Sequence, residues 1–217
     1  MDDAANPPRR ELRIGDTAPN FRARSTAGPL AMKDYRGKWV VMFSHPADFT
    51  PVCTSEFIAF AKAAPQFAAL DCELMALSVD SLFSHFAWIR AIRDRFGVEV
   101  RFPIIEDPTL VVGRAYGMVA DDATDAGAVR SVFVIDPEGT VRATSCYPVE
   151  IGRSVKEVLR MVAALQAADR RKGLAPEGWQ PGDALLAQPQ PTIDTVFAAD
   201  DIVAWFLSEE GQGAADG

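Results

Sequence analysis

A single strand-to-helix transition constrains the fold of this chain more than any other sequence feature. Residues 39–43 form a short apolar run rich in aromatic and β-branched side chains, which predicts a buried strand. Pro46 and Pro51 interrupt that strand, and apolar residues at near-helical spacing predict a helix over residues 54–70. Together these elements predict a layered α/β unit with Cys53 in the first turn of the helix.

The position of Cys53 favours a charged sulfur. Backbone N–H groups in the first turn of a helix have no intrahelical acceptor, so that end of the helix attracts an anion. A cysteine thiolate is such an anion, and the thiolate rather than the thiol is the nucleophile. The transition therefore predicts a reactive thiol, and an inert core residue is the alternative for any lone cysteine.

Strands and helices alternate along the rest of the chain. The segments expected as strands are 73–79, 101–105, 131–135 and 140–146. The segments expected as helices are 82–96, 110–116 and 154–172, with an acidic loop at 121–125. The apolar face of the helix 82–96 is expected to carry Leu82, Phe86, Ile89 and Phe96. Gly97 ends that helix, and a turn at 136–139 makes the last two strands a hairpin, which completes a layered α/β domain.

Composition and charge narrow the classes of protein. With 217 residues, 48% of them apolar, the chain suits one full-sized domain plus an extension. A formal net charge of −8 disfavours nucleic acid and anionic membranes as partners. Residues 1–16 show neither a secretory signal nor a membrane anchor, and the longest apolar run, 202–207, is too short to span a bilayer. We therefore expect a cytoplasmic protein.

Cysteine and histidine usage limits the possible cofactors. The three cysteines form no Cys-x-x-Cys pair, and their odd number argues against a secreted disulfide framework. With only two histidines, no thiolate-imidazole zinc cluster of recognised spacing is present. We expect redox chemistry of an individual thiol, without a cofactor or metal.

Pro46, Thr50 and Cys53 fit the Pro-x-x-x-Thr-x-x-Cys signature of the peroxiredoxins. The wider run 44–56 resembles their one-cysteine branch within the AhpC/TSA group. Similarity continues through residues 77–81, 102–107, 130–137 and 178–183, and covers about residues 12–185. The resemblance implies a thioredoxin-like fold, a central mixed sheet flanked by helices, with a C-terminal arm.

The resemblance also suggests how the chain is organised. It implies a peroxidase domain over residues 12–173 and an arm over residues 174–217. Prolines interrupt the arm, yet four of its aromatic residues require burial: Trp179, Phe197, Trp205 and Phe206. In similar proteins this arm crosses a partner subunit, which implies a homodimer and leaves higher oligomers open. The alternative is an arm that folds back on its own domain.

The implied activity assigns roles to several residues. A peroxidase reduces hydrogen peroxide and organic hydroperoxides when a thiolate attacks the O–O bond and becomes a sulfenic acid. Cys53 is then the peroxidatic nucleophile, Thr50 offers a hydroxyl to thiolate and peroxide, and Pro46 shields the site from water. Arg130 begins a strand expected to run antiparallel to residues 39–45, so its cation should lie near the sulfur and polarise the peroxide.

Three polar residues near this motif have less defined roles. His45 is a candidate auxiliary residue that assists proton movement, or one that only bonds to the backbone. Glu56 is expected to orient an arginine or to cap the first turn of the helix. His85, inside the helix 82–96, is expected to be structural.

The remaining cysteines are candidates to resolve the sulfenic acid. A helix over residues 54–70 puts Cys72 on the order of 25 Å from Cys53, whereas a disulfide needs Cα atoms about 4.4–6.8 Å apart. Symmetric hairpin pairing puts Cys146 opposite residue 129, which makes Cys146 a possible resolving residue. We nevertheless expect a one-cysteine cycle, in which an external reductant acts: a small thiol, a glutaredoxin or a thioredoxin-like protein.

A phospholipase, a cysteine hydrolase and a redox sensor or chaperone are the alternatives to the peroxidase. Some animal relatives carry a Gly-x-Ser-x-Gly phospholipase motif, but this chain has Lys38 where the serine would stand. Cys53 and His45 could belong to a cysteine hydrolase, which would lack the rest of a triad. A redox sensor or an oxidation-triggered chaperone would use the same Cys53 chemistry without turnover. Sustained loss of peroxide distinguishes the enzyme from these alternatives.

Overall fold

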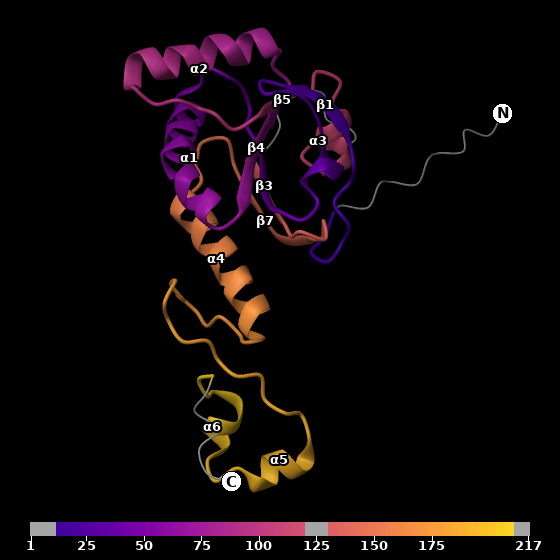
Figure 1. Cartoon of the computed structure of the whole chain (residues 1–217), viewed down its shortest axis with the longest axis vertical. Helices are drawn as coiled ribbons and strands as arrows, with labels where there is room; N and C mark the ends of the chain where they lie inside the picture. The colour runs from indigo at the N-terminus through magenta and orange to yellow at the C-terminus, as the bar shows by residue number, and fades with distance from the viewer. Residues whose placement is uncertain (1–11, 120–129, 211–217) are drawn as a thin grey trace, which may run out of the picture. The chain divides into compact units, whose positions relative to one another are not determined.

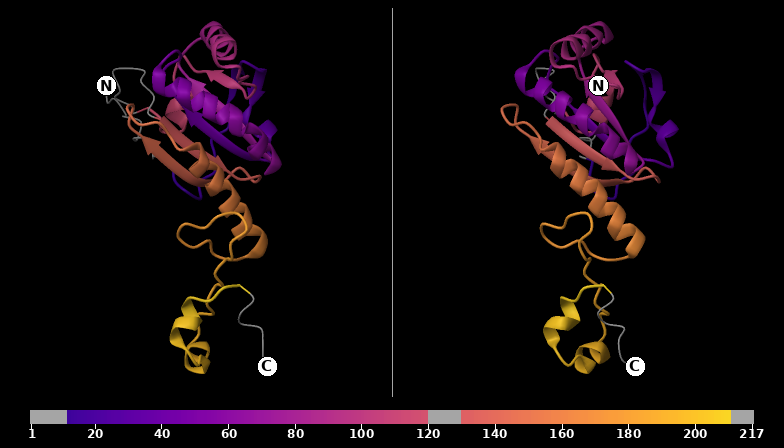
Figure 2. Two further views of the ribbon diagram at one scale, coloured as in Figure 1. Left: turned by 90° about the vertical axis from the view of Figure 1, so that its left-hand side faces the viewer. Right: turned by 60° about the vertical axis from the view of Figure 1, so that its left-hand side comes forward.

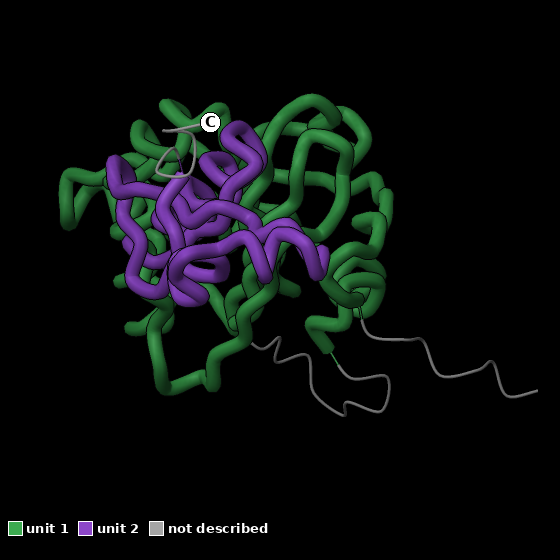
Figure 3. Tube along the Cα trace, turned by 90° about the horizontal axis from the view of Figure 1, so that it is seen from below, with its two compact units in different colours: residues 1–155 green, residues 156–217 purple. Residues whose placement is uncertain are grey.

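The computed structural model describes residues 12–119 and 130–210 of the chain. It divides into two compact units, residues 1–155 and residues 156–217, coloured separately in Figure 3. The division falls at the beginning of the last long helix, whereas the sequence places the boundary after it, at residue 173. The expected acidic loop, 121–125, lies outside the described residues.

A seven-stranded mixed sheet forms the centre of the first unit, in the order β2-β1-β5-β4-β3-β6-β7 (Figure 1). The strands are β1 (Arg22–Ser25), β2 (Gly28–Ala31), β3 (Trp39–Ser44), β4 (Cys72–Ser78), β5 (Ile104–Glu106), β6 (Arg130–Ile135) and β7 (Val141–Tyr147). Strands β3, β4 and β5 run parallel, and the other neighbouring pairs are antiparallel. The layered α/β architecture predicted from the sequence is confirmed.

Helices cover both faces of this sheet (Figures 1 and 2). One face carries α1 (Pro51–Ala69) and α2 (Leu82–Phe96), and the other carries η1 (Met32–Tyr35) and α3 (Val111–Ala115). Phe43 of β3 stacks on Phe60 of α1 with ring centroids 4.2 Å apart. Its neighbour Met42 joins a core cluster with Val112 on the opposite face. Because β3 is covered on both faces, its residues form an unbroken buried run.

The hairpin of β6 and β7 places Cys146 differently from the simple pairing expected. Symmetric pairing puts Cys146 opposite residue 129, but Cys146 lies opposite Ser131. A β-bulge shifts the register, because β7 carries an extra residue near the turn. Adjacent residues alternate between faces, so Cys146 and Ser131 lie on the opposite face of the sheet from Arg130. The expected pairing is therefore wrong.

Helix α2 has the expected bounds but a different buried face. The Ser81 side chain caps its N-terminus, and Gly97, with φ of 65°, closes its C-terminus. The residues that it buries are His85, Trp88 and Ile92. Phe86 and Phe96 of the expected apolar face are 44% and 54% exposed. That prediction is wrong, because His85 bonds to the buried Asp48 carboxylate and Trp88 to the part-buried Thr54 hydroxyl, and a hydrophobic pattern does not reveal such bonds.

The second unit begins within α4 (Val155–Arg171) and includes α5 (Ile193–Ala198) and α6 (Ile202–Phe206). Isolated bridges join Leu186 to Leu174 and to Glu209. Trp179 is buried, and its indole N–H donates to the carbonyl of Asp183. This segment thus has its own hydrogen-bonded structure.

Apolar side chains of α5 and α6 are exposed. Phe197 is 80% exposed and Phe206 51%. The others are Ile193, Ile202 and Val203, with Leu207 directly after α6. The burial expected for the two phenylalanines is therefore not reached within the described parts of the chain. None of the described helices combines the length and apolar character needed to cross a bilayer.

Candidate active site

Cys53 lies in the first turn of α1, where the sequence predicts it. Thr50 is the N-cap and Pro51 the first helical residue, a position where the missing N–H costs no helical hydrogen bond. The Cys53 side chain is fully buried, and its sulfur lies 3.2 Å from Nη1 of Arg130. A guanidinium and the positive end of a helix therefore act on one sulfur atom.

Arg130 reaches Cys53 because β6 lies antiparallel beside β3. β3 leads into the loop before α1, so the first residue of β6 is at the same end of the sheet. Nε and Nη2 of Arg130 donate to the carbonyl of Val149 at 3.1 and 2.8 Å, and Nη1 also donates to Glu56 at 2.9 Å. These bonds fix the planar guanidinium in one orientation toward the sulfur.

Glu56 connects this arginine to a second one, Arg153, which no sequence motif indicates. Glu56 follows Cys53 by three residues, so both occupy one face of α1. Arg153 donates its backbone N–H and Nε to one carboxylate oxygen, at 2.6 and 2.8 Å, and Nη2 to the other at 2.7 Å. The two residues are 97 positions apart, and Arg153 stands outside any recognised motif, so no local pattern reveals the pair.

Cys53, Glu56, Arg130 and Arg153 form a buried charge cluster. Each side chain belongs to a residue that is at most 5% exposed. The arginines carry two positive charges and Glu56 one negative charge, which leaves one positive charge without a counterpart. Because an uncompensated buried charge is costly, a thiolate at Cys53 is favoured, since it makes the cluster neutral.

We expect Glu56→Gln to lower the free energy of unfolding by about 3–5 kcal/mol, because it removes the carboxylate that pairs with both buried arginines. Glu73→Gln is the matched control. It removes a surface pair with Lys38, in which the side chains are 43% and 48% exposed, and should cost about 0–1 kcal/mol. Urea unfolding followed by tryptophan fluorescence measures both values. Equal losses in the two variants would show that the cluster is not strongly coupled.

The loop before α1 holds Pro46 and Thr50, and both are half-buried. The Thr50 hydroxyl donates to the carbonyl of Ala47 at 2.9 Å, which closes the loop on itself. Phe49, between Pro46 and Thr50, has a φ of 59°, a strained conformation for a residue with a Cβ. The roles of Pro46 and Thr50 toward a peroxide remain predictions.

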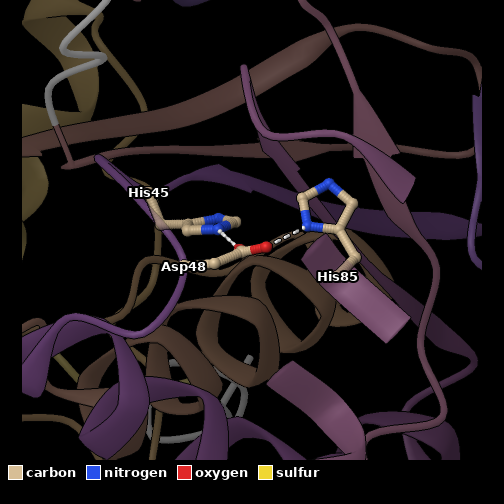
Figure 4. A group of neighbouring side chains, drawn as sticks. All are labelled: His45, Asp48 and His85. Carbon is tan, nitrogen blue, oxygen red and sulfur yellow. Dashed lines mark hydrogen bonds and ion pairs between the residues drawn. The ribbon is translucent and has the colours of Figure 1, made fainter. Parts of the chain in front are cut away.

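A second group of polar side chains includes Asp48 of this loop. Figure 4 shows the carboxylate of Asp48 between the imidazoles of His45 and His85. Oδ1 lies 2.9 Å from Nε2 of His45, and Oδ2 lies 2.8 Å from Nδ1 of His85. Burial alone would raise the pKa of Asp48, but the hydrogen bonds from both histidines outweigh it and lower that pKa to about 2. Burial also lowers the pKa of His45, against the opposing effect of Asp48.

Among the described residues, His45, Asp48 and His85 also form a group of side chains that could bind a metal ion, with donor atoms within 4.8 Å of one another. The facing nitrogens lie at hydrogen-bond distances from an ionised carboxylate, so each carries a proton. A metal ion would have to displace both protons. The arrangement thus fits a hydrogen-bonded triad better than a ligand set.

The low pKa of Asp48 predicts an acid-dependent contribution to stability. A carboxylate with a folded pKa of about 2 and an unfolded pKa near 3.8 stabilises the fold above pH 4, and this contribution is lost as the pH falls toward 2. The gap in unfolding free energy between the wild type and Asp48→Asn should therefore shrink by roughly 2 kcal/mol from pH 5 to pH 2. Urea unfolding at several pH values measures it, and a constant gap would contradict the assignment.

The other cysteines lie away from Cys53 in the fold. Cys72 begins β4 and pairs with Trp39 at the start of β3, the end of that strand far from the active-site loop. Burial raises the pKa of the Cys72 thiol to about 12, which keeps it protonated and inert. Cys146 is exposed, and its sulfur accepts from the Ser131 hydroxyl at 3.9 Å on the other face of the sheet. The sheet therefore separates Cys146 from Cys53 within one chain.

Comparison with known proteins identifies the family. The AhpC/TSA family pattern matches residues 14–144, and the C-terminal domain of 1-Cys peroxiredoxin matches residues 164–197. Peroxiredoxin 2 of Caldanaerobacter subterraneus is 49% identical over 179 residues, which cover 82% of this chain and 81% of that protein. The chain belongs to the peroxiredoxin family.

Further relatives support this peroxiredoxin assignment. Peroxiredoxin 2 of Picrophilus torridus is 46% identical over 91% of this chain and 98% of its own length. The structure of a yeast mitochondrial 1-Cys peroxiredoxin superposes with a TM-score of 0.80 at 40% identity, covering 90% of this chain and 97% of that one. Peroxiredoxin 6 of Arenicola marina gives a TM-score of 0.77 at 34% identity, over 85% of this chain and 87% of that one.

Family membership confirms two predictions. The thioredoxin-like fold, with its mixed sheet between helices and its C-terminal helices, is the fold of these relatives. The chain is a thiol peroxidase, an oxidoreductase that acts on peroxides.

Proposed function

We propose that this peroxiredoxin reduces hydrogen peroxide and organic hydroperoxides by a one-cysteine cycle centred on Cys53. The thiolate attacks one peroxide oxygen, the O–O bond breaks, and the second oxygen leaves as hydroxide or alkoxide with the electron pair. Cys53 becomes a sulfenic acid. One external thiol then forms a mixed disulfide with release of water, and a second thiol restores the Cys53 thiol as the external disulfide leaves.

The observation that carries this proposal is the Cys53 sulfur 3.2 Å from the Arg130 guanidinium in a fully buried site. Before the reaction, the cation stabilises the thiolate. During the reaction, negative charge moves to the leaving oxygen, and Arg130 together with the Thr50 hydroxyl can stabilise it there. Pro46 limits the access of water. Glu56 and Arg153 hold Arg130 in place rather than exchange protons.

A one-cysteine cycle is supported by the positions of the other thiols, since Cys72 is buried near the far end of β3 and Cys146 lies across the sheet. The reductant in this proposal is a small thiol, a glutaredoxin or a thioredoxin-like protein. The yeast relative is described with glutathione and thioredoxin systems, which makes both classes the first to assay.

We also propose that this peroxiredoxin acts in antioxidant defence in the cytoplasm and that it does so as a homodimer. The exposed apolar side chains of α5 and α6 support an arm over residues 174–217 that packs on a second subunit, since such surface is unfavourable in water. Three free cysteines fit a reducing compartment. Analytical ultracentrifugation of the whole chain tests the dimer, and a monomer at micromolar concentration would contradict it.

The test of the cycle is mass spectrometry of the fully reduced protein after a slight excess of hydrogen peroxide, under non-reducing conditions. One oxygen added at Cys53 supports the one-cysteine peroxidase. A bond from Cys53 to Cys146 or Cys72 would replace that mechanism with a two-cysteine cycle. Oxidation without sustained peroxide loss in the presence of glutathione or thioredoxin would instead favour the redox sensor or oxidation-triggered chaperone.

A further inference from the structure

The triad of His45, Asp48 and His85 contains both histidines of the chain. All three residues are buried, and the two imidazoles are fully buried. They come from different elements: His45 follows β3, Asp48 lies in the loop before α1, and His85 lies in α2. The carboxylate thus links α2 to the loop that delivers Cys53 (Figure 4).

The carboxylate fixes the proton positions of both rings. An ionised carboxylate only accepts hydrogen bonds, so Nε2 of His45 and Nδ1 of His85 must each donate to it. In neutral rings the remaining nitrogens, Nδ1 of His45 and Nε2 of His85, then carry lone pairs. Neither of these buried nitrogens has a hydrogen-bond partner among the described residues. A buried acceptor left unpaired calls for an explanation.

Helix α2 also holds the first turn of α1 by a second contact. The indole N–H of Trp88, three residues after His85, donates to the Thr54 hydroxyl at 3.2 Å. The Trp88 ring packs against His45, with centroids 5.3 Å apart, and against Phe57, at 4.5 Å. His45 in turn packs against Phe57 at 4.7 Å, one turn after Cys53. The His45 ring is therefore enclosed against the helix that carries the nucleophile.

We propose that His85 is a positioning residue for the chemistry of Cys53. It acts from α2 through the Asp48 carboxylate and holds the His45 imidazole neutral, with its proton on Nε2 and its Nδ1 lone pair available. This inference rests on the proposed peroxidase function, because it assigns the Nδ1 lone pair, which has no partner among the described residues, to proton movement during the reaction with peroxide. His85 itself touches neither the sulfur nor the substrate in this arrangement.

The triad has a direct electrostatic consequence. His85 draws part of the Asp48 charge into its own hydrogen bond. Without that bond the carboxylate interacts with His45 alone, and His45 becomes easier to protonate. A protonated His45 carries a proton on both nitrogens and loses the free lone pair. The charged or titratable groups that act on His45 are Asp48, His85 and Asp80, and Asp80 is unchanged in any variant of His85.

The first test is ¹⁵N NMR of protein labelled at histidine, and its spectrum contains only these two rings. The expected result is a neutral His45 imidazole at pH 7 with its proton on Nε2, and a proton on Nδ1 of His85, assigned with His85→Asn. A charged His45 ring at pH 7, or a proton on Nδ1 of His45, would overturn the proposal. This measurement does not depend on peroxidase activity, so it separates the triad from the proposed function.

The second test is the rate constant of reduced protein with hydrogen peroxide as a function of pH. His85→Leu removes the donor and should lower the rate at least about tenfold, and should move the acid side of the profile up by roughly one pH unit. His85→Asn keeps an N–H near the Nδ1 position and should restore the rate to within about threefold.

Three outcomes separate the possibilities. Equal losses in both variants, without a pH shift, would indicate a merely structural role and overturn the proposal. Wild-type rates in His85→Leu would also overturn it. A wild-type protein that does not react with peroxide at all would instead contradict the proposed function. If His85→Leu does not fold, the ¹⁵N spectrum of the wild type still decides, because a charged His45 ring or a proton on its Nδ1 overturns the proposal.

Discussion

Cys53→Ser is expected to lower the rate of peroxide consumption by more than about 10³-fold, because it removes the nucleophile itself. A serine hydroxyl stays protonated beside Arg130, whereas the sulfur can ionise to neutralise the buried charge cluster. The substitution is small, so the loop and α1 should keep their structure. Stopped-flow mixing with hydrogen peroxide gives the rate of the first step, and a coupled thiol assay gives turnover.

Cys146→Ser is the matched control for this variant. Cys146 is exposed on the other face of the sheet, so both the first step and turnover should remain within about twofold of the wild type, as for ordinary surface substitutions. Loss of turnover in Cys146→Ser with a normal first step would identify Cys146 as a resolving residue. Residual peroxide consumption in Cys53→Ser at the wild-type rate would contradict the site.

The second large effect is expected at Arg130. Arg130→Met should lower the rate constant with hydrogen peroxide by about 10²–10³-fold, because a fixed cation no longer stabilises the thiolate and the developing charge. Arg130→Lys keeps the charge but should still lose about tenfold or more. One ammonium group cannot hold Val149 and Glu56 while it faces the Cys53 sulfur, as the planar guanidinium does.

Arg90→Met is the control for the loss of an arginine. Arg90 is on α2 with a side chain that is 66% exposed and pairs with Asp94, so its removal should change the rate less than about twofold. Unfolding free energies of all three variants show whether a slower rate reflects misfolding. A slow Arg130→Met with wild-type stability supports the electrostatic role, and a wild-type rate would contradict it.

Local sequence predicts much of this molecule because its signals act over a few residues. The aromatic and β-branched run before Pro46 predicts β3, and Pro51 with the following apolar spacing predicts α1. The bounds of α2 follow from apolar spacing and from Gly97, which adopts the left-handed conformation that ends a helix. β5 is shorter than expected, since its strand pairing begins only after Pro103.

The register of β7 and the buried face of α2 could not be predicted from the sequence and are known only from the tertiary structure. A single extra residue at the bulge shifts every later pair of the hairpin, and a symmetric turn gives no sign of it. On α2, His85 and Trp88 are buried because Asp48 and Thr54 accept hydrogen bonds from their ring N–H groups. A hydrophobic pattern records how apolar a residue is, and it does not record whether a distant group will satisfy its polar atoms.

The sequence by itself determined the α/β class, the place of Cys53 in the first turn of a helix and the family signature around it. Those features depend on backbone preferences and on residue types within one segment. Only the tertiary structure decided the charge balance around the sulfur, because Arg153 and Glu56 are 97 positions apart in the sequence. It also decided the second histidine partner of Asp48, because His85 lies 37 positions away. Hydrogen bonds between distant segments depend on how the sheet and helices pack, and that packing is set by the whole chain.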